Sequence, residues 1–467
     1  MSVPPGVAHG VERDARLDDP RIADILARFD ALGGMEGFCE AVRHANYCRR
    51  PLRLQGKVVR VVDGKSRVVF NTRTLPDQVL LKACGSRRET LCPSCASIYR
   101  GDAFQLVAAG LRGGKGVPES VAEHPAVLVT LTAPSFGPVH RRQRDGRCHP
   151  KRRMCPHQVS LRCTKHHDEG DPTVGQALCA SCHDYEGAVL FNLTASELFR
   201  RTTIYTLRAV GELAGLSVRE VAKVVRLSYV KVVEFQRRGV VHVHAILRLD
   251  GVGDGLEPPP PLFDAELLAE AVAVAVRKVH APLAEQKGPA ARRVRWGSQV
   301  DVTPISDVAD RRRRAAAYLA KYSTKSSDAS GALDHRLRAG VRIRGELAPQ
   351  MRRLVATAWA LGEAPAYREL GLRAWAHTLG FRGHFATKSR RYSTTFGKLR
   401  VARHEWRQSQ EEDPDRADSL EFSEWKVVGT GFSTAGDAWL AAGMAREART
   451  VRIAAIEDRT YEWRRAA

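Results

Sequence analysis

The sequence contains no long hydrophobic run. No stretch reaches the roughly 18 consecutive apolar residues that suggest a transmembrane helix. Residues 1–20 are polar and charged, without the apolar core of a signal peptide. We therefore expect a cytoplasmic protein with no membrane partner. Because thiols stay reduced in the cytoplasm, the 10 cysteines are expected to bind metal ions rather than to form disulfides.

Signatures of several enzyme classes are absent as well. Gly64-Lys65-Ser66 matches the end of a phosphate-binding loop, but the earlier glycine of such a loop is missing. No P-loop helicase is therefore apparent in the sequence. It contains no nucleophile elbow of the G-x-S-x-G type and no internal repeat with a period of roughly 20–50 residues.

Acidic residues are few relative to basic ones. The chain carries 74 Lys and Arg against 52 Asp and Glu, a formal net charge of +22. Such a surplus favours a polyanionic partner such as nucleic acid, although the arginine-rich composition of a GC-rich genome produces the same surplus. With 467 residues, 43% of them hydrophobic, the chain is long enough for two or three domains with real cores.

The order of the predicted elements indicates an α+β fold. Hydrophobic periodicity predicts strands at 126–132, 227–236, 240–249 and 294–302, and helices at 188–213, 263–279 and 311–325. The resulting β-α-β-β-α-β order is that of the ferredoxin-like split βαβ fold. We place this domain at residues 120–330, with a Cys/His-rich insertion at about 145–185. An N-terminal region (1–115) with a zinc-ribbon-like cysteine cluster precedes it, and a basic C-terminal region (331–467), expected to contact DNA, follows.

Two histidines, His242 and His244, stand one residue apart in a predicted strand and so project from the same face. If residues 237–239 form a three-residue hairpin loop that ends in a left-handed glycine, Glu234 lies opposite His242, with Gln236 on the same face. Two imidazoles and a carboxylate or amide oxygen suit a divalent ion such as Mg²⁺ or Mn²⁺. The choice between Glu234 and Gln236 stays open, and ordinary strand histidines are the alternative interpretation.

Two tyrosines, Tyr318 and Tyr322, lie one turn apart in the last predicted helix of the domain, with Lys321 between them. A tyrosine has a pKa of about 10 and needs help to act as a nucleophile. A cation on a phosphate makes the phosphorus more electrophilic, and Lys321 is placed to orient that phosphate or to stabilise a phenolate. Simple packing residues are the alternative interpretation.

The cysteines include two CxxC pairs of the zinc-ribbon type. We expect two structural zinc sites, since four thiolates leave no open position for chemistry. A redox role is disfavoured because neither pair has a βαβ setting. The first predicted set is Cys48, Cys84, Cys92 and Cys95, and the second is Cys155, Cys163, Cys179 and Cys182. The spacing leaves Cys148, His149, His157, His166, His167 and His183 as substitutes in the second set, and Cys39 as a plain thiol.

Two basic clusters are candidates for DNA contact. The first opens the predicted tyrosine helix, where it would meet phosphates, and the second combines positive charge with an aromatic ring on which a base can stack. A solvated charged face is the alternative for both. The clusters are Arg311, Arg312, Arg313 and Arg314, and Lys388, Arg390, Arg391 and Tyr392.

Several segments resemble the actinobacterial plasmid replication initiators of the HUH-endonuclease rolling-circle group. The matching segments are VLVTLTAPSF at 127–136, HVH at 242–244, YLAKYSTK at 318–325, CGSRRETLCPSC at 84–95 and GFRGHFATKSRRYSTTF at 380–396. The resemblance covers most of residues 80–400. It implies that His242 and His244 are metal ligands and that Tyr318 or Tyr322 is the nucleophile. Tyr318, with a lysine three residues on, is the first choice.

The resemblance further implies a metal-dependent enzyme that nicks one strand of origin DNA and keeps the 5′ phosphate as a phosphotyrosine. The released 3′ hydroxyl would prime rolling-circle replication of a plasmid or integrative element. Its partners would be single-stranded origin DNA and host replication proteins, including a helicase. A relaxase or single-strand transposase is an alternative with the same chemistry on another DNA. A non-enzymatic zinc-ribbon regulator is a third, which leaves the histidine pair and the tyrosine helix unexplained.

Overall fold

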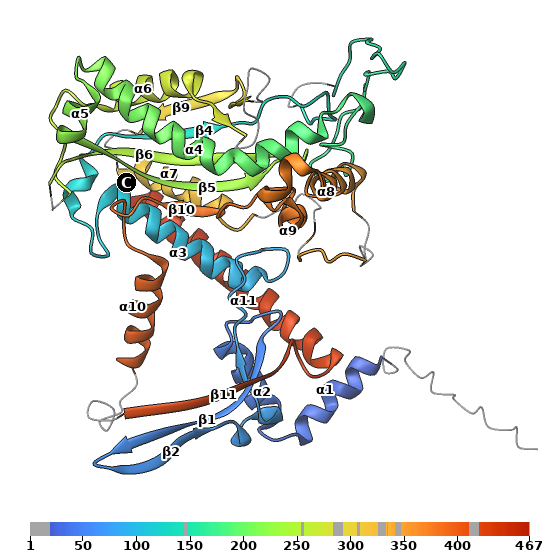
Figure 1. The fold of residues 1–467 in the computed structure, drawn as a ribbon. Helices are drawn as coiled ribbons and strands as arrows, with labels where there is room; N and C mark the ends of the chain where they lie inside the picture. The colour runs from blue at the N-terminus through green and yellow to red at the C-terminus, as the bar shows by residue number, and fades with distance from the viewer. Residues whose placement is uncertain are drawn as a thin grey trace, which may run out of the picture. The chain divides into compact units, whose positions relative to one another are not determined.

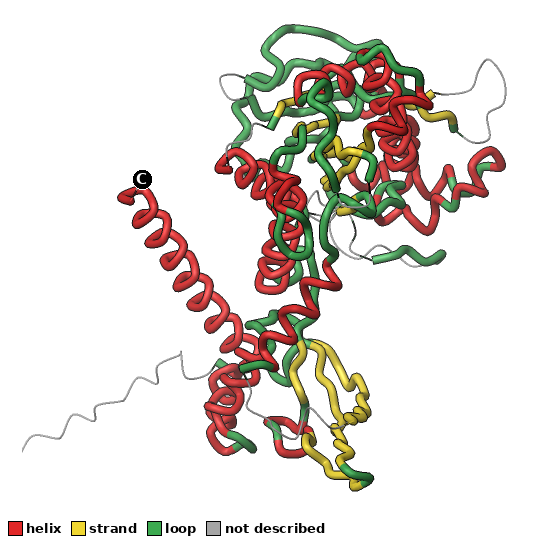
Figure 2. The backbone as a smooth tube through the Cα atoms, turned by 90° about the vertical axis from the view of Figure 1, so that its left-hand side faces the viewer, coloured by secondary structure: helices red, strands yellow, loops and turns green. Residues whose placement is uncertain are grey.

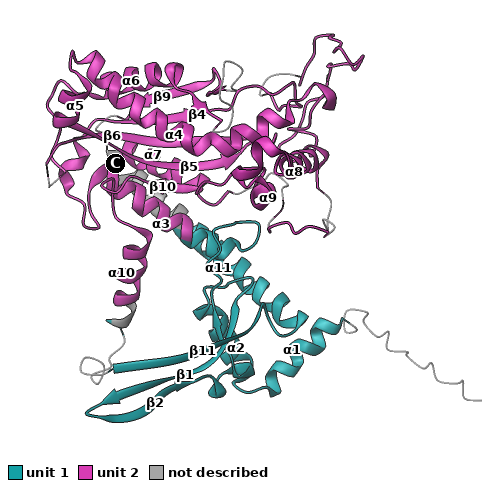
Figure 3. Ribbon diagram, in the orientation of Figure 1, with its two compact units in different colours: residues 1–98, 407–467 teal, residues 99–406 magenta. Residues whose placement is uncertain are grey.

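The structure is a computed structural model that describes residues 19–143, 147–253, 256–283, 293–305, 309–325, 333, 335–340, 347–410 and 420–466. The chain divides into two compact units (Figure 3). One comprises residues 1–98 and 407–467, and the other comprises residues 99–406. This grouping differs from the predicted domains, because the region 331–467 is shared between the units and its last part joins the N-terminal region.

The larger unit is built on a five-stranded sheet with the order β10-β5-β6-β4-β9. All neighbouring strands are antiparallel. The two longest strands of this sheet, β5 and β6, are rich in valine, leucine and isoleucine, and most of their residues are buried. The strands are β4 (Ala126–Leu131), β5 (Val225–Phe235), β6 (Val241–Gly251), β9 (Val300–Pro304) and β10 (Ala386–Lys388).

Helices cover both faces of this sheet (Figure 1). One face packs against α4 (Tyr185–Leu213), α5 (Val218–Val224), α6 (Ala265–Lys278) and α8 (Pro349–Leu361). The other packs against α3 (Pro93–Arg112) and α7 (Ala309–Tyr322). The unit also contains β7 (Ala281–Pro282), β8 (Arg293–Val294), α9 (Leu372–Trp375) and α10 (Phe396–Gln408).

Alternation along β6 sets what each face of the sheet carries. Val243, Ala245 and Leu247 point into the core shared with α4 and α6. Ile246 points into the core shared with α3 and α7. Since successive side chains of a strand alternate between faces, the even-numbered His244 lies on the α3 and α7 side.

The predicted order of elements is present as β4, α4, β5, β6, α6 and β9, followed by α7. The strand predicted at 294–302 is instead divided into β8 and β9. Between them Trp296 is buried and its Nε1 donates a hydrogen bond to Thr202 Oγ1 at 2.9 Å. The Gly297 amide donates to the Thr132 carbonyl at 2.8 Å. These anchors hold the segment to other elements and interrupt the strand.

The smaller unit contains a second antiparallel sheet, whose strands lie side by side in Figure 2. Its order is β11-β1-β2, and β3 also pairs with β1. The strands are β1 (Leu52–Val62), β2 (Lys65–Asn71), β3 (Leu80–Lys82) and β11 (Leu420–Thr430). The helices are α1 (Pro20–Asp30), α2 (Gly34–His44) and α11 (Ala435–Ala466).

A buried arginine ties the helices of this unit together. Arg28 of α1 donates to Asp437 of α11 at 2.5 Å and to Asp77 at 2.7 Å. Two carboxylates around one guanidinium offset the cost of burying its charge. The longest helix of the described part is α11, with 32 residues, yet none of the described helices combines the length and apolarity needed to cross a membrane.

Candidate active site

A strand pair presents two imidazoles and a carboxylate on one face of the central sheet. In the register of β5 and β6, Glu234 lies opposite His242, as the sequence predicts from a three-residue turn. Gly239 has a φ of +82°, in the left-handed region that favours glycine. Its amide donates to the Gln236 carbonyl at 2.8 Å. The turn therefore fixes which residues face each other.

The three side chains converge closely enough to share one ion. A donor atom from each of Glu234, His242 and His244 lies within 4.8 Å of the other two. Glu234 Oε1 is 3.4 Å from His244 Nε2. The two imidazole rings are 4.7 Å apart and nearly perpendicular, at 82°. Oxygen and nitrogen donors of this kind suit a divalent cation, and three protein ligands leave positions open for phosphate oxygens.

The structure favours Glu234 over Gln236 as the third ligand. The side-chain oxygen of Gln236 accepts a hydrogen bond from Arg238 Nε at 2.8 Å. Its amide nitrogen is the atom that faces the histidines, 3.5 Å from His242 Nδ1. An amide NH₂ group donates hydrogen bonds and cannot bind a cation. Glu234 instead places a carboxylate oxygen 3.4 Å from His244 Nε2.

Within the trio of Glu234, His242 and His244, the protonation states of His242 and Glu234 suit metal binding. Burial, together with the neighbouring His244, lowers the pKa of His242 to about 4, so this imidazole is neutral at pH 7. At Glu234 burial opposes ionisation, but the hydrogen bond to His244 and the charge of Lys325 hold the pKa below its ordinary value. A metal requires neutral imidazoles and an ionised carboxylate.

Two threonines that had no predicted role, Thr130 of β4 and Thr132 directly after it, lie behind the imidazoles. Thr130 Oγ1 is 3.3 Å from His244 Nδ1, and Thr132 Oγ1 is 3.2 Å from His242 Nδ1. A partner on the outer nitrogen fixes the orientation and tautomer of a ligating histidine. The available signal was the Thr-Leu-Thr spacing, which repeats the same-face spacing of the histidines on the adjacent strand.

Helix α7 brings both predicted tyrosines to His244. Tyr318 Oη lies 3.5 Å from His244 Nδ1, and the side chain is 36% exposed. Tyr322 stacks nearly flat on the His244 ring, with centroids 4.2 Å apart and an interplanar angle of 18°. Burial, followed by the contact with Tyr322, raises the pKa of Tyr318 to about 12. Tyr318 therefore offers an accessible hydroxyl that needs a cation to act as a phenolate.

Lys325, rather than Lys321, is the lysine that meets the trio. Its ammonium is 3.0 Å from Glu234 Oε2 and 4.8 Å from the centre of the Tyr322 ring. Lys321 is exposed, and its ammonium is 6.0 Å from the centre of the same ring. Lys325 ends the segment 318–325 that resembles the replication initiators, but it had no predicted role.

The arginines at the start of α7 are divided between solvent and core. Arg311, Arg313 and Arg314 are exposed. Arg311, Arg314 and Tyr318 recur at spacings of three and four residues, so they lie on one face of the helix. Phosphates on either side of a cleaved bond could meet these two guanidinium groups.

Two residues predicted to contact DNA are buried, and their positions are incompatible with that role. Arg312 is 1% exposed and donates to the carbonyls of Leu111 and His124 at 3.1 and 3.2 Å. Tyr392 is fully buried, and its hydroxyl donates to the Val107 carbonyl at 3.2 Å. Their polar groups satisfy backbone acceptors inside the protein, a requirement that residue type alone does not reveal.

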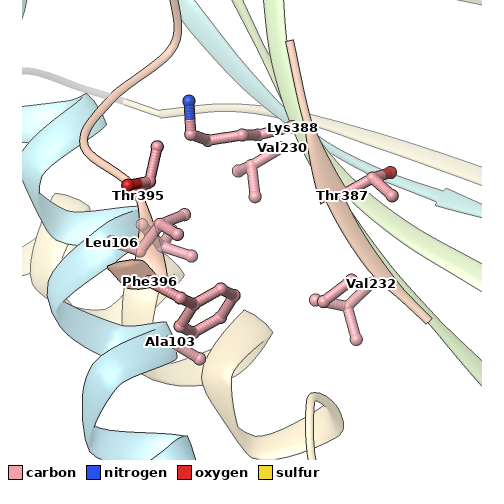
Figure 4. Close-up of a pocket in the computed structure, with 10 residues that line it drawn as sticks. Ala103, Leu106, Val230, Val232, Thr387, Lys388, Thr395 and Phe396 are labelled. Atoms are coloured by element: carbon pink, nitrogen blue, oxygen red, sulfur yellow. The ribbon is translucent and has the colours of Figure 1, made fainter. Parts of the chain in front are cut away.

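Lys388 of the second basic cluster lines an apolar pocket of about 130 Å³, formed by α3, β5, β10 and the start of α10. Figure 4 shows Val230, Val232 and Phe396 in its lining and the Lys388 ammonium at one side. Val232 and Glu234 are two residues apart in β5, so the pocket lies on the sheet face of the trio. An apolar cavity of roughly 150 Å³ can hold benzene, so this pocket suits one ring. Arg390 and Arg391 are exposed nearby in the chain.

Three further clusters bring together four cysteine or histidine donors each, again within 4.8 Å of one another. The first is the predicted set of four cysteines. The second prediction is wrong in one member, because Cys163 belongs to a separate cluster and His157 takes its place. The clusters are Cys48, Cys84, Cys92 and Cys95; Cys155, His157, Cys179 and Cys182; and His140, Cys148, Cys163 and His167.

The path of the backbone explains this exchange. Cys163 pairs with His149 through two backbone hydrogen bonds of 2.7 and 2.9 Å, which carries it away from the CxxC pair at 179–182. His157 Nδ1 instead lies 3.2 Å from Cys182 Sγ. Of the substitutes that the spacing left open, Cys148, His157 and His167 are used, whereas His149, His166 and His183 lie outside the three clusters.

The donor distances fit tetrahedral metal sites. With a Zn–S bond of about 2.3 Å, the sulfurs of a tetrahedral site are about 3.8 Å apart. The Cys48–Cys92 and Cys84–Cys95 sulfur pairs are both 3.7 Å apart. All 10 cysteines are free thiols, and Cys39 lies outside the clusters. These groups can hold metal ions.

Comparisons with known proteins agree over nearly the whole chain. The family model RepSA, described as "Replication initiator protein, pSAM2", matches residues 34–446. A curated protein of Streptomyces ambofaciens, described as "Replication initiator protein", is 38% identical over 465 residues. The match covers 95% of this chain and 97% of that protein. No solved structure matches the chain.

Proposed function

The chain belongs to the RepSA family of plasmid replication initiators, and we propose that it initiates rolling-circle replication of a plasmid or integrative element as a site-specific single-strand DNA endonuclease and strand transferase. The observation that carries the proposal is the meeting of a Glu234, His242 and His244 trio with the Tyr318 hydroxyl, 3.5 Å from His244. The strand order β5-β6-β4-β9, with α4 and α6 on one face, is consistent with a split βαβ domain of the HUH type.

In this proposal the trio holds Mg²⁺ or Mn²⁺. A divalent ion held by these residues would polarise the scissile phosphate and stabilise the charge that develops on it. Thr130 and Thr132 keep the two imidazoles oriented through their outer nitrogens. Lys325 holds the carboxylate of Glu234 in its ionised form. These residues lie on β4, β5 and β6, directly after β4 (Thr132), or in the turn that follows α7 (Lys325).

Tyr318 is the proposed nucleophile. Its oxygen forms a bond to phosphorus while the bond from phosphorus to the 3′ oxygen of the preceding nucleotide breaks. The phenolic proton passes to water, and the leaving oxygen takes a proton from water. The products are a 5′-phosphotyrosine and a 3′ hydroxyl, so one ester replaces another and the strand can later be rejoined. Tyr322 supports the site by stacking on His244.

Residues on the sheet face of the trio would also contact the DNA on either side of the cleaved phosphate. Arg311 and Arg314 lie along the face of α7 that carries Tyr318, and Lys388 lies beside the apolar pocket. Backbone phosphates pair with such cations, and bases stack in apolar pockets with an aromatic wall such as Phe396. In this proposal the DNA partner is single-stranded origin DNA, and a host helicase opens the duplex.

Replacing the nucleophile tests the proposal directly. The Tyr318→Phe variant should bind an origin-strand oligonucleotide as the wild type does, yet form no covalent adduct in the presence of Mn²⁺. The adduct is measured on denaturing gels and located by mass spectrometry of the tyrosine peptide.

Tyr322→Phe is the matched control, because it removes the other hydroxyl of the same helix and keeps the ring that stacks on His244. It should still form the adduct. An adduct in Tyr318→Phe together with its loss in Tyr322→Phe would reverse the assignment of the nucleophile. No adduct with any origin strand in the wild type would refute the endonuclease itself.

A further inference from the structure

The cluster that the sequence did not predict lies in the segment between β4 and α4. Cys148 and Cys163 come from two stretches that pair antiparallel, where the amides of His149 and Cys163 donate to each other's carbonyls, and the amide of His140 donates to the Gln176 carbonyl. The rings of His140 and His167 meet edge to face, 5.2 Å apart at 84°. Cys163 Sγ lies 3.4 Å from His167 Nε2. Two thiolates and two imidazoles in this arrangement are a donor set for tetrahedral zinc.

An aspartate behind one of these ligands supports the same conclusion independently. Asp171 Oδ2 lies 2.5 Å from His167 Nδ1, which leaves His167 Nε2 directed at Cys163. A carboxylate on the outer nitrogen is the usual partner of a zinc-ligating histidine. Asp171 is itself held, because the amide and hydroxyl of Thr173 donate to its other oxygen at 2.8 and 2.6 Å.

The same loop contacts the turn between β5 and β6. Arg237 Nη1 donates to the Asp171 carbonyl at 2.9 Å, and Arg237 Nη2 donates to the Glu169 carbonyl. Gly175 passes so close to the turn that a Cβ there would lie 2.4 Å from the Arg237 carbonyl carbon. The loop at 168–175 therefore packs on the turn with backbone against backbone.

From the turn, contacts continue to the candidate active site. Arg238 donates to the Ala133 and Pro134 carbonyls at 2.9 and 2.8 Å, and to Gln236 Oε1 at 2.8 Å. The amide nitrogen of Gln236 lies 3.5 Å from His242 Nδ1. The arginine pair of the turn thus has one member on the loop and one beside the trio.

We propose that this cluster is a structural zinc site that clamps the 168–175 loop onto the β5–β6 turn and so positions the strand pair of the trio. Its ligands are His140, Cys148, Cys163 and His167. Together with the other two clusters, the chain then holds three zinc ions, not two. Only the consequence for cleavage rests on the proposed function; the site and the clamp do not.

Zinc content and the zinc ligand shell test the site in the full chain. Nine thiolates and three imidazoles shared among three ions predict three zinc per chain and an average of three sulfurs and one nitrogen per zinc. Elemental analysis of protein purified without chelator gives the first value, and X-ray absorption gives the second. Two zinc per chain, with seven sulfurs and one nitrogen shared between them, would overturn the third site.

A double substitution, Cys148→Ser with Cys163→Ser, should remove one zinc and leave two. If this variant folds poorly, the wild-type ligand shell still decides, because it requires no substitution. Retention of all three zinc ions in a folded double variant contradicts the assignment of these ligands.

Deuterium exchange at the turn tests the clamp. Arg237→Ala should keep three zinc ions and exchange the amides of Gly239 and Val241 about 5- to 10-fold faster, because two hydrogen bonds to the loop are lost. The matched control is Arg142→Ala, which removes an exposed arginine 3.6 Å from the Glu169 carboxylate without touching the turn. Its exchange should equal that of the wild type.

Unchanged exchange in both Arg237→Ala and the double cysteine variant would overturn the clamp. These measurements use no DNA, so a chain that nicks nothing would still show the clamp. If the wild type nicks, Arg237→Ala should require more Mn²⁺ for half-maximal nicking, by on the order of 10-fold. An unchanged Mn²⁺ requirement beside faster exchange would separate the clamp from the trio and overturn its positioning role.

Discussion

The trio in the central sheet and the cysteine-histidine clusters are built in opposite ways. Glu234, His242 and His244 stand on two long, fully paired strands and offer three oxygen or nitrogen donors. The clusters offer four donors each, with at least two sulfurs. A closed set of four ligands holds structure, whereas an open set of three leaves room for a substrate oxygen. The donor count therefore separates a candidate reaction centre from structural sites within one chain.

The elements beneath the two kinds of site differ as well. Between β4 and α4, the only helix or strand of the described residues is a three-residue 3-10 helix, Ala180–Cys182. The remaining β-type pairing there consists of isolated bridges, such as that of Met154 with Ser160. A segment with so little backbone pairing would depend on bound ions for its shape. The strand pair of the trio has its shape from hydrogen bonds and a buried core. Loss of a metal should therefore have different consequences in the two places.

The largest expected effect is a pair of opposite responses, in which one variant loses nicking and the other loses stability. His242→Ala should abolish nicking while changing stability by no more than about 1 kcal/mol, since the strand stays paired. Cys92→Ser should cost about 3 kcal/mol and lower the melting temperature by about 6–12 °C, because a buried thiolate of a closed site is lost. Nicking assays with Mn²⁺ and thermal unfolding followed by circular dichroism measure both variants.

The comparison fails if the two variants behave alike. Undiminished nicking by His242→Ala would refute its metal role. An unchanged melting temperature for Cys92→Ser, with zinc content unchanged, would remove the structural role from the first cluster.

A sharper contrast lies beside the two histidines, between Glu234 and Gln236. Glu234→Ala should raise the Mn²⁺ concentration for half-maximal nicking by about 100-fold or more, since a ligand is lost. Gln236→Ala should raise it by no more than about 10-fold, since only an outer contact is lost. Titration of nicking rate against Mn²⁺ measures both. The opposite ranking would make Gln236 the third ligand.

The features that the sequence predicted correctly are local ones. The same-face histidines follow from the period of a strand, and the pairing of Glu234 with His242 follows from the length of a turn that ends in Gly239. The place of Tyr318 beside the trio required only the order of the elements. All of these depend on residues close in the chain or on strand topology.

The features that the sequence missed depend on the tertiary path. Cys163 is nearer in sequence to the CxxC pair at 179–182 than Cys148 is, yet a bridge with His149 takes it to another cluster. Arg312 belongs to a run of four arginines, and only the packing of α7 shows that it faces the core. Lys325 reaches Glu234 because the chain turns after Tyr322. Composition and spacing carry no information about such turns.

The smallest effect concerns the support behind the imidazoles. Thr130→Val keeps the shape of the side chain and removes the hydroxyl that lies 3.3 Å from His244 Nδ1. It should raise the Mn²⁺ requirement for nicking by about 10-fold, because His244 Nδ1 then keeps only the Tyr318 hydroxyl at 3.5 Å and the ring orientation is less fixed. The matched control is Thr303→Val, a threonine on the neighbouring strand that contacts Asp301 and neither histidine. Equal Mn²⁺ requirements in the two variants would mean that strand packing and the stacked Tyr322 alone orient His244. The trio would then need no hydrogen-bond partner on the outer nitrogen of its histidine, unlike the cluster in which Asp171 contacts His167 Nδ1.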